Sequence, residues 1–221
     1  MLASVALAAF LIAACVAAEP SAEPAADPIA APTTVPGRFG EAWSCAADAP
    51  ALAVAHETAL EPALLTLEAW IRVDALPDDA AVRALVGKNG DASTPGHYGL
   101  YLSGDKLGAA IDGEGAGAAT LAFSTDRLVR AGQWHHAAMT WDGRVLKVYL
   151  DGAPAAAVVI DRSRSRGDGA LAIGSGVAAI VDEVVLWDRA LPRAEVAAHA
   201  AGERAHAADP GLVRRWTGDP Q

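Results

Sequence analysis

Two pairs of carboxylates are the residues of this sequence that could support catalysis. Hydrolysis of a glycosidic bond needs two carboxylates that reach one cleft. Asp182 and Glu183 are adjacent, and neighbours on a β-strand point to opposite faces. Asp112 and Glu114 have the alternate spacing, but they lie in the glycine-rich stretch 112–117 without aromatic neighbours. The sequence also has no GxSxG, HExxH or Walker A motif, so we predict that the protein is not an enzyme.

Histidines and aromatic rings are the next candidates. His135 and His136 look like a metal pair, but strand neighbours diverge, so we expect one in the core and one on the surface. For sugar binding, Trp70 lies on the polar face of its strand, and Tyr98 and Tyr101 follow it in the sequence. Aromatic rings with nearby polar groups are usual in sugar sites. The alternative is that these rings fill the core or lie under a C-terminal helix.

The two cysteines, Cys15 and Cys45, are expected to have different roles. Cys15 ends the phrase Ile-Ala-Ala-Cys, which resembles a bacterial lipobox, after an apolar leader. We therefore predict a lipid on Cys15 and a lipid-anchored protein of the cell envelope. The alternative is cleavage by ordinary signal peptidase after Val16-Ala17-Ala18, which would give a secreted protein. Cys45 is expected to be a small buried hydrophobe.

The composition of the chain limits its possible partners and indicates how it is divided. The 221 residues carry a formal charge of −10, which argues against nucleic-acid binding because phosphates need a basic face. We divide the chain into a leader, 1–18, an acidic tether, 19–36, and one domain, 37–221. Proline recurs every fourth residue in the tether and favours extended backbone.

The stretch from Gln133 to Gly152 gives the clearest structural signal. Trp134–Trp141 and Val145–Leu150 alternate with period two, and Asp142-Gly143 between them predicts a type I′ hairpin turn, which needs positive φ at both residues. Further alternating strands are expected at Leu65–Asp74, Gly96–Ser103 and Ile180–Trp187, and one short helix near Pro192–Ala201. The fold class is therefore all-β, a two-sheet antiparallel sandwich with one short C-terminal helix.

Several phrases resemble laminin-G-like jelly-roll domains of the concanavalin A-like lectin group. They are the Trp-His strand with its Asp-Gly turn and Tyr-x-Asp-Gly ending, Gly37-Arg-Phe-Gly-Glu-Ala42, and IVDEVVLW followed by Arg-Ala-Leu. The resemblance implies a jelly roll. It also implies a possible Ca²⁺ site with Asp182 and, from the opening region, Asp48, because Ca²⁺ takes oxygen ligands. The alternative is that Asp182 bonds only to backbone.

The function predicted from these features is a non-catalytic extracytoplasmic module that recognises a carbohydrate or a surface protein. A structural envelope lipoprotein without a small ligand is the alternative, and a glycan hydrolase of the same fold is the third reading. Arg166-Gly167-Asp168 spells an integrin-binding tripeptide, which we interpret as an ordinary loop.

The tail contains one more predicted strand. Leu212–Trp216 alternates, with Leu212, Arg214 and Trp216 on one face. A free tail ending in Trp would expose a large ring, so we predict that this strand pairs with the segment near Phe39–Trp43.

Overall fold

The computed structural model describes residues 33–48, 52–90, 93–174 and 176–220. They belong to one compact unit, Pro32–Gln221. The predicted leader, Cys15 and most of the tether lie outside the described residues. None of the described helices is both long and apolar enough to cross a bilayer.

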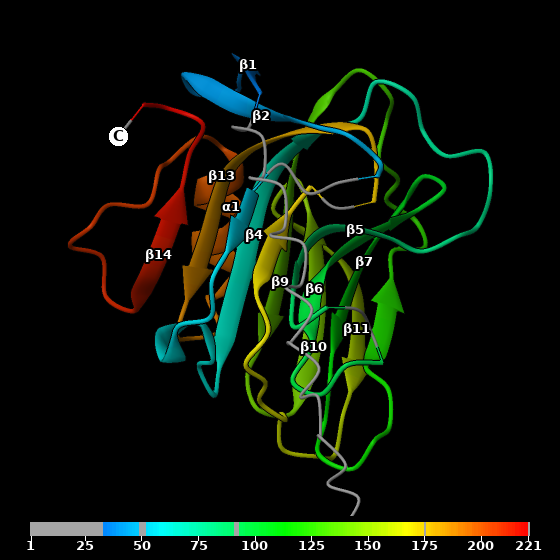
Figure 1. Cartoon of the computed structure of the whole chain (residues 1–221), viewed down its shortest axis with the longest axis vertical. Helices are drawn as coiled ribbons and strands as arrows, with labels where there is room; N and C mark the ends of the chain where they lie inside the picture. The colour runs from blue at the N-terminus through cyan, green and yellow to red at the C-terminus, as the bar shows by residue number, and fades with distance from the viewer. Residues whose placement is uncertain (1–32, 49–51, 91–92, 175, 221) are drawn as a thin grey trace, which may run out of the picture. The chain divides into compact units, whose positions relative to one another are not determined.

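The described strands form two antiparallel sheets (Figure 1). The eight-stranded first sheet contains β1 (Thr34–Pro36), β2 (Glu41–Cys45), β13 (Ala179–Trp187), β4 (Leu65–Arg72), β9 (Trp134–Trp141), β10 (Val145–Leu150) and β11 (Ala153–Val159) in that order, with β14 (Leu212–Trp216) also on β13. The six-stranded second sheet has the order β3 (Leu52–Val54), β12 (Leu171–Ile173), β5 (Arg83–Lys88), β6 (Tyr98–Ser103), β7 (Lys106–Ile111) and β8 (Thr120–Phe123). The predicted two-sheet sandwich is confirmed.

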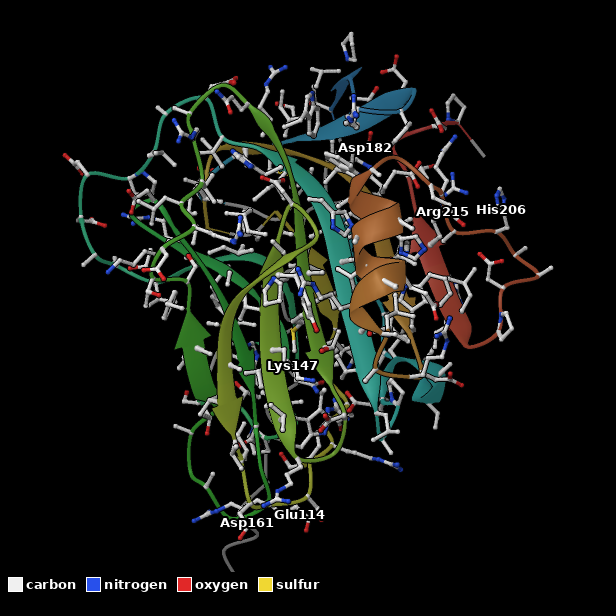
Figure 2. The ribbon with its side chains drawn as sticks, turned by 180° about the vertical axis from the view of Figure 1, so that it is seen from behind. Glu114, Lys147, Asp161, Asp182, His206 and Arg215 are labelled. Carbon is white, nitrogen blue, oxygen red and sulfur yellow. The ribbon has the colours of Figure 1, made fainter. Side chains whose placement is uncertain are left out.

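Period-two alternation builds the core between the sheets. In β4, Leu67, Ala69 and Ile71 enter this core, and Met139 and Trp141 enter it from β9. On the other face of the first sheet, Ala138, Val185 and Trp187 pack with Val196 of the helix α1 (Arg193–Ala200). Figure 2 shows α1 lying across the first sheet. The predicted helix is confirmed, and Pro192 is its N-cap.

The central hairpin has the predicted strands but not the predicted turn. β9 and β10 begin and end where the sequence placed them, and Trp141 pairs with Leu146. Only Gly143 of the Asp142-Gly143 pair has a positive φ, 93°, so the type I′ prediction is wrong. Instead, the Asp142 carboxylate accepts hydrogen bonds from the backbone N–H groups of Arg144 and Val145, at 3.0 and 2.7 Å, and so closes a wider loop.

A β-bulge in β13 overturns the expectation that Asp182 and Glu183 point to opposite faces. The register against β4 shifts between Asp182 and Val185, and Glu183 has a positive φ of 48°. Val181 and Val184, which flank the pair, both enter the core between the sheets. The extra residue therefore leaves both carboxylates on the outer side.

The tail is a strand, as predicted, but its predicted partner is wrong. β14 pairs with β13, where Val184 lies opposite Trp216, whereas β2 pairs with β13 and with β1. A register shift in β14 also separates Leu212 from Trp216, so that Val213 and Trp216 pack on the inner core and Leu212 on the α1 side. β1 itself comes from the last residues of the segment assigned to the tether.

The tail closes an edge of β13 and adds apolar surface to the core. We therefore expect deletion of Pro210–Gln221 to lower the melting temperature by several degrees, because a loss of a few kcal/mol does so in a domain of this size. Differential scanning fluorimetry checks this, with Leu128→Ala, at a 41% exposed side chain, as the control that should change little. An unchanged melting temperature for the truncated chain would contradict the structural role of β14.

Candidate functional site

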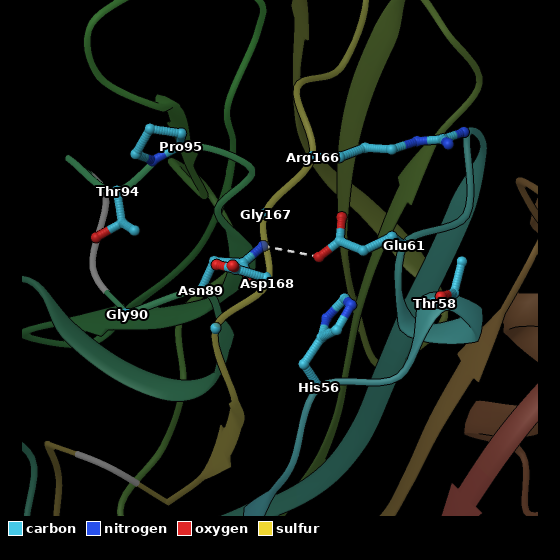
Figure 3. A pocket seen from close by; sticks show the side chains of 11 residues that line it. His56, Thr58, Glu61, Asn89, Gly90, Thr94, Pro95, Arg166, Gly167 and Asp168 are labelled. Carbon is cyan, nitrogen blue, oxygen red and sulfur yellow. Dashed lines mark hydrogen bonds between the residues drawn. The ribbon is translucent and has the colours of Figure 1, made fainter.

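A cavity of about 790 Å³ opens beside the end of β5. We call it the end pocket and define it by His56, Thr58, Glu61, Asn89, Thr94 and Arg166–Gly169. Figure 3 shows the Asn89–Glu61 hydrogen bond at its base, with Thr94 and Pro95 on one side and Arg166 on the other. The volume is in the range of sites that bind small molecules.

The base of the end pocket is a buried network of charges around Glu61. Glu61 pairs through Oε1 with Lys88 Nζ at 3.0 Å and through Oε2 with Arg164 Nη2 at 2.6 Å. Asn89 donates to Glu61 Oε1 at 2.8 Å and accepts from Lys88 at 2.7 Å. Lys88 is wholly buried, which is tolerated because its ammonium also donates to the carbonyl of Gly169 at 2.5 Å.

Arg164 extends the network towards the core. Its guanidinium donates to the carbonyls of Pro62 and Gly96, and it lies 4.8 Å from the centre of the Tyr98 ring. The Tyr98 hydroxyl donates to the Leu60 carbonyl at 2.8 Å. Burial raises the pKa of Tyr98. These bonds join the segment before β4, the end of β5 and the segment before β12 at one point.

The wall formed by residues 166–168 is fixed by backbone contacts. Gly96 has a φ of 79°, and a side chain on it would collide with the backbone of Arg166 and Gly167. Asp112 accepts hydrogen bonds from the Gly96 N–H, at 2.9 Å, and from the Ser165 hydroxyl. The Arg-Gly-Asp tripeptide is therefore part of the pocket wall, with its glycine packed against the 94–96 turn.

The groups that the end pocket offers to a ligand come from its exposed rim. His56, Thr58, Arg166 and Asp168 are all exposed. Together they provide a hydroxyl, an imidazole, five guanidinium donors and a carboxylate acceptor. This mixture of donors and acceptors fits a ligand rich in hydroxyl groups. The sequence did not indicate this site, since Arg166–Asp168 was interpreted only as an ordinary loop.

The structure does not bring the three predicted sugar-binding aromatics together. Tyr98 is wholly buried in the core and so presents no ring face to a sugar. Tyr101, 5% exposed, hydrogen-bonds to His97 and packs with Ala110 on the outer face of the second sheet. Trp70, 7% exposed, lies on the outer face of the first sheet. The alternative, in which the rings are packed inside the protein, describes all three.

Trp70 lies beneath other side chains. The Phe39 and His136 rings meet it edge-on at 6.0 and 5.4 Å, and the guanidinium of Arg38 lies 4.8 Å from its centre. His136 is therefore buried, like His135 on the opposite face, which corrects the expectation that one of the two would be on the surface. His135 bonds instead to Asp151, at 2.8 Å.

The two predicted calcium ligands have different surroundings in the structure. Asp182 is buried, and its two oxygens accept backbone N–H groups, Oδ1 from Glu183 and Oδ2 from Phe39, each at 2.8 Å. Burial raises the pKa of Asp182, although the backbone bonds oppose this. Asp48 is exposed, and no group of three or more His, Cys, Asp or Glu that could hold a metal occurs among the described residues. Asp182 thus bonds to backbone through both oxygens, and the calcium site stays a prediction.

Cys45 is buried, as the sequence predicted. Its thiol is buried in the core, and burial raises its pKa to about 12. A thiol with such a pKa is unreactive at neutral pH.

A second buried polar cluster fastens α1 to the first sheet. Glu68 Oε1 accepts from Trp187 Nε1 at 2.8 Å and from His199 Nδ1 at 2.9 Å, and Oε2 lies 3.4 Å from His136 Nε2. Burial alone would raise the pKa of Glu68, but the bonds from the two histidines outweigh it and lower the pKa to about 2. Burial also disfavours charged His199, yet the bond to Glu68 raises its pKa above 6.5.

These shifts predict a pH window for the docking of α1. Glu68, with its lowered pKa, contributes stability above its ordinary value of 4.5 and loses it as the pH falls towards about 2. His199, with its raised pKa, contributes stability below 6.5 and loses it as the pH rises through its folded value. We expect Glu68→Gln to lower the melting temperature by roughly 5–10 °C between pH 4.5 and 6.5 and by less above that window.

Thermal scans across pH measure this difference. The matched control is Glu57→Gln, which removes an exposed pair with Arg214 and should have a small effect at every pH. If Glu68→Gln lowers the melting temperature by the same amount from about pH 5 to about pH 9, the pairing with His199 is contradicted.

Comparisons with known proteins establish the family. The sequence model of the concanavalin A-like lectin/glucanases superfamily matches residues 47–197, and the chain belongs to this superfamily. The predicted resemblance is confirmed. No curated protein matches the chain significantly in sequence.

Solved structures share the fold at low identity. The binding domain of Paraclostridial Mosquitocidal Protein 1 has a TM-score of 0.60 and 15% identity, over 77% of this chain and 45% of that one. A putative carbohydrate binding protein from Bacteroides ovatus ATCC 8483 has a TM-score of 0.55 and 17% identity, over 70% of this chain and 45% of that one. The heptameric SAP-like pentraxin from Limulus polyphemus has a TM-score of 0.54 and 17% identity, over 72% of this chain and 78% of that one. The chain thus spans less than half of the first two, and the likeness concerns the fold alone.

Proposed function

We propose that this protein is a non-catalytic, extracytoplasmic binding module that recognises carbohydrate through the end pocket. The observation that carries the proposal is a preformed cavity of about 790 Å³ whose base is a satisfied hydrogen-bond network and whose rim is polar. Because Glu61 and Asn89 are bonded to each other and to Lys88, they hold the shape of the pocket. Thr58, Arg166 and Asp168 remain for the ligand, together with the second ring nitrogen of His56, whose Nδ1 lies 3.3 Å from Lys88 Nζ.

The low-identity structures agree with this proposal. One is called a binding domain and another a putative carbohydrate binding protein, so the fold is used for recognition in proteins of similar architecture. The rival proposal, a structural envelope protein, is favoured by one observation. The outer face of the second sheet carries Ala84, Ala110 and Ala119 around the buried Tyr101, and Phe123 is the one partly exposed ring of this cluster.

A glycan array with rim variants separates the two proposals. We expect the protein to bind at least one glycan, and Arg166→Ala and Asp168→Asn each to weaken that binding by about tenfold, the effect of a lost charged hydrogen bond. Arg193→Ala is the matched control, since Arg193 is an exposed residue of α1, outside the end pocket. No binding by the wild type, or binding that the rim variants leave unchanged, would favour the structural protein.

We propose further that a lipid on Cys15 holds the module at a membrane of the cell envelope. The proposal rests on the lipobox-like phrase and the proline-rich segment that follows it. Cys15→Ala should move the protein from the membrane fraction to the soluble fraction, and Cys45→Ala, at a core position, should leave it in membranes. A soluble wild-type protein that begins at Glu19 would support ordinary secretion instead.

A further inference from the structure

A second cavity, of about 530 Å³, lies beside the end pocket. We call it the side pocket and define it by Ala63, Leu64, Glu114, Ser163, Arg164 and Arg166. Arg166 lines both cavities, so the two adjoin along the segment 163–166. Figure 2 places Glu114 and Asp161 at one end of the sandwich, away from Asp182.

A buried ion pair connects the two cavities beneath their surface. Glu61 lines the end pocket and Arg164 lines the side pocket, and Glu61 Oε2 lies 2.6 Å from Arg164 Nη2. Both residues are buried. Separating such a pair is unfavourable, because each partner would become a buried charge without a counter-charge. The ion pair therefore holds the two cavities next to each other.

Each cavity offers an exposed carboxylate and an exposed hydroxyl group. In the end pocket they belong to Asp168 and Thr58, and in the side pocket to Glu114 and Ser163. Neither carboxylate forms an ion pair or accepts a hydrogen bond within the described part of the chain. A carboxylate can accept from neighbouring hydroxyls of a sugar ring, and a serine or threonine hydroxyl both donates and accepts. Each cavity thus has the polar groups that one sugar unit needs.

Arg166 lies between these two sets of groups. Its side chain is exposed and has no ion pair or hydrogen bond to the residues that the structure describes. Its backbone is held in place, because the Ser165 hydroxyl donates to Asp112 and Gly167 packs against the 94–96 turn. A guanidinium at this position can donate to oxygen atoms on either side of it.

The charges and the repetition of these groups restrict the ligand. Asp168 and Glu114 are two free carboxylates beside one free guanidinium, and the whole chain has a formal charge of −10. A polyanionic glycan would be repelled by both carboxylates. Because a carboxylate and a hydroxyl recur on the two sides of Arg166, the rim suits a ligand whose own polar groups recur. A chain of neutral sugars has this property.

We propose that the end pocket and the side pocket bind two adjoining sugars of one neutral oligosaccharide chain, with Arg166 at the linkage between them. This inference rests on the proposed function and names the ligand class of that site. Asp168 and Thr58 contact the hydroxyls of one sugar, and Glu114 and Ser163 contact those of the next. Leu64, at 40% exposure, provides an apolar surface for the face of the second ring.

The length of the sugar chain tests the proposal. The probes are D-glucose, D-xylose and D-mannose, their β-1,4-linked tetrasaccharides, and the acidic tetragalacturonate, each measured by isothermal titration calorimetry. We expect at least one neutral tetrasaccharide to bind about tenfold tighter than its monosaccharide, because the second sugar binds at the effective concentration set by the first. A monosaccharide that binds as tightly as its tetrasaccharide overturns the proposal, and so does tetragalacturonate if it binds more tightly than every neutral probe.

Surface variants locate the gain in affinity. Ser163→Trp fills the side pocket and should lower tetrasaccharide affinity to that of the monosaccharide, whose own affinity should not change. Glu114→Gln should weaken tetrasaccharide binding alone, because a charged acceptor bonds more strongly than a neutral one. The matched controls are Val159→Trp and Asp161→Asn, at exposed residues outside both pockets, which should bind as the wild type does. Equal weakening by a variant and its control, or by neither, counts against the side pocket.

The outcome is separable from that of the proposed function. If Arg166→Ala and Asp168→Asn weaken glycan binding but Ser163→Trp leaves the tetrasaccharide gain intact, the end pocket keeps its function and the two-sugar inference is overturned. The same holds if an array glycan binds but no neutral tetrasaccharide does. If Asp168→Asn has no effect on any bound glycan, or if nothing binds, the proposed function falls and the inference falls with it.

Discussion

The end pocket depends on Glu61, a single carboxylate that pairs with two buried cations. Glu61 precedes β4 of the first sheet, Lys88 ends β5 of the second, and Arg164 lies 103 residues further along the chain from Glu61. Removing three charges from water costs several kcal/mol each, and the arrangement persists only because nearly every polar atom finds a partner. The arrangement has a geometric result: bonds to one carboxylate hold the three segments together at the base of the end pocket.

Strained backbone recurs where side chains hold polar clusters. Among the described residues, Asn89, Asp151 and Glu183 are the non-glycine residues with positive φ, at 61°, 52° and 48°. Each conformation costs of order 1–3 kcal/mol, and each residue makes strong bonds in return. Asn89 completes the base of the end pocket, Asp151 binds His135, and Glu183 pairs with Arg204 and Arg215. At all three positions the positive φ therefore occurs together with a side chain that anchors a polar cluster.

These positions explain what the sequence could and could not predict. Alternation located β9 and β10 to the residue because every side chain there has one of two environments, core or outer face. The same rule failed at Glu183 and at Val213, where a bulge adds a residue and period two is interrupted. The two pockets were not predictable from the spacing of residues in the sequence, because Glu61, Lys88 and Arg164 become neighbours only when the chain folds into two packed sheets. The aromatic candidates were misplaced for a related reason: position on a polar face does not tell whether another element covers that face, as Phe39 and Arg38 cover Trp70.

Under the proposed function, coverage of the two sheets assigns recognition to the loops. The outer face of the first sheet is occupied by α1, fastened through His199 and Glu68, and by the Arg38 and Phe39 side chains over Trp70. The outer face of the second sheet carries an apolar cluster of Tyr101, Phe123 and three alanines. Loops at the end of a rigid sandwich can vary in sequence without disturbing the core, and binding residues concentrate on such loops. In this chain the loops that meet at Glu61 combine a cavity with a hydrogen-bonded base and exposed groups of both charges, Arg166 and Asp168.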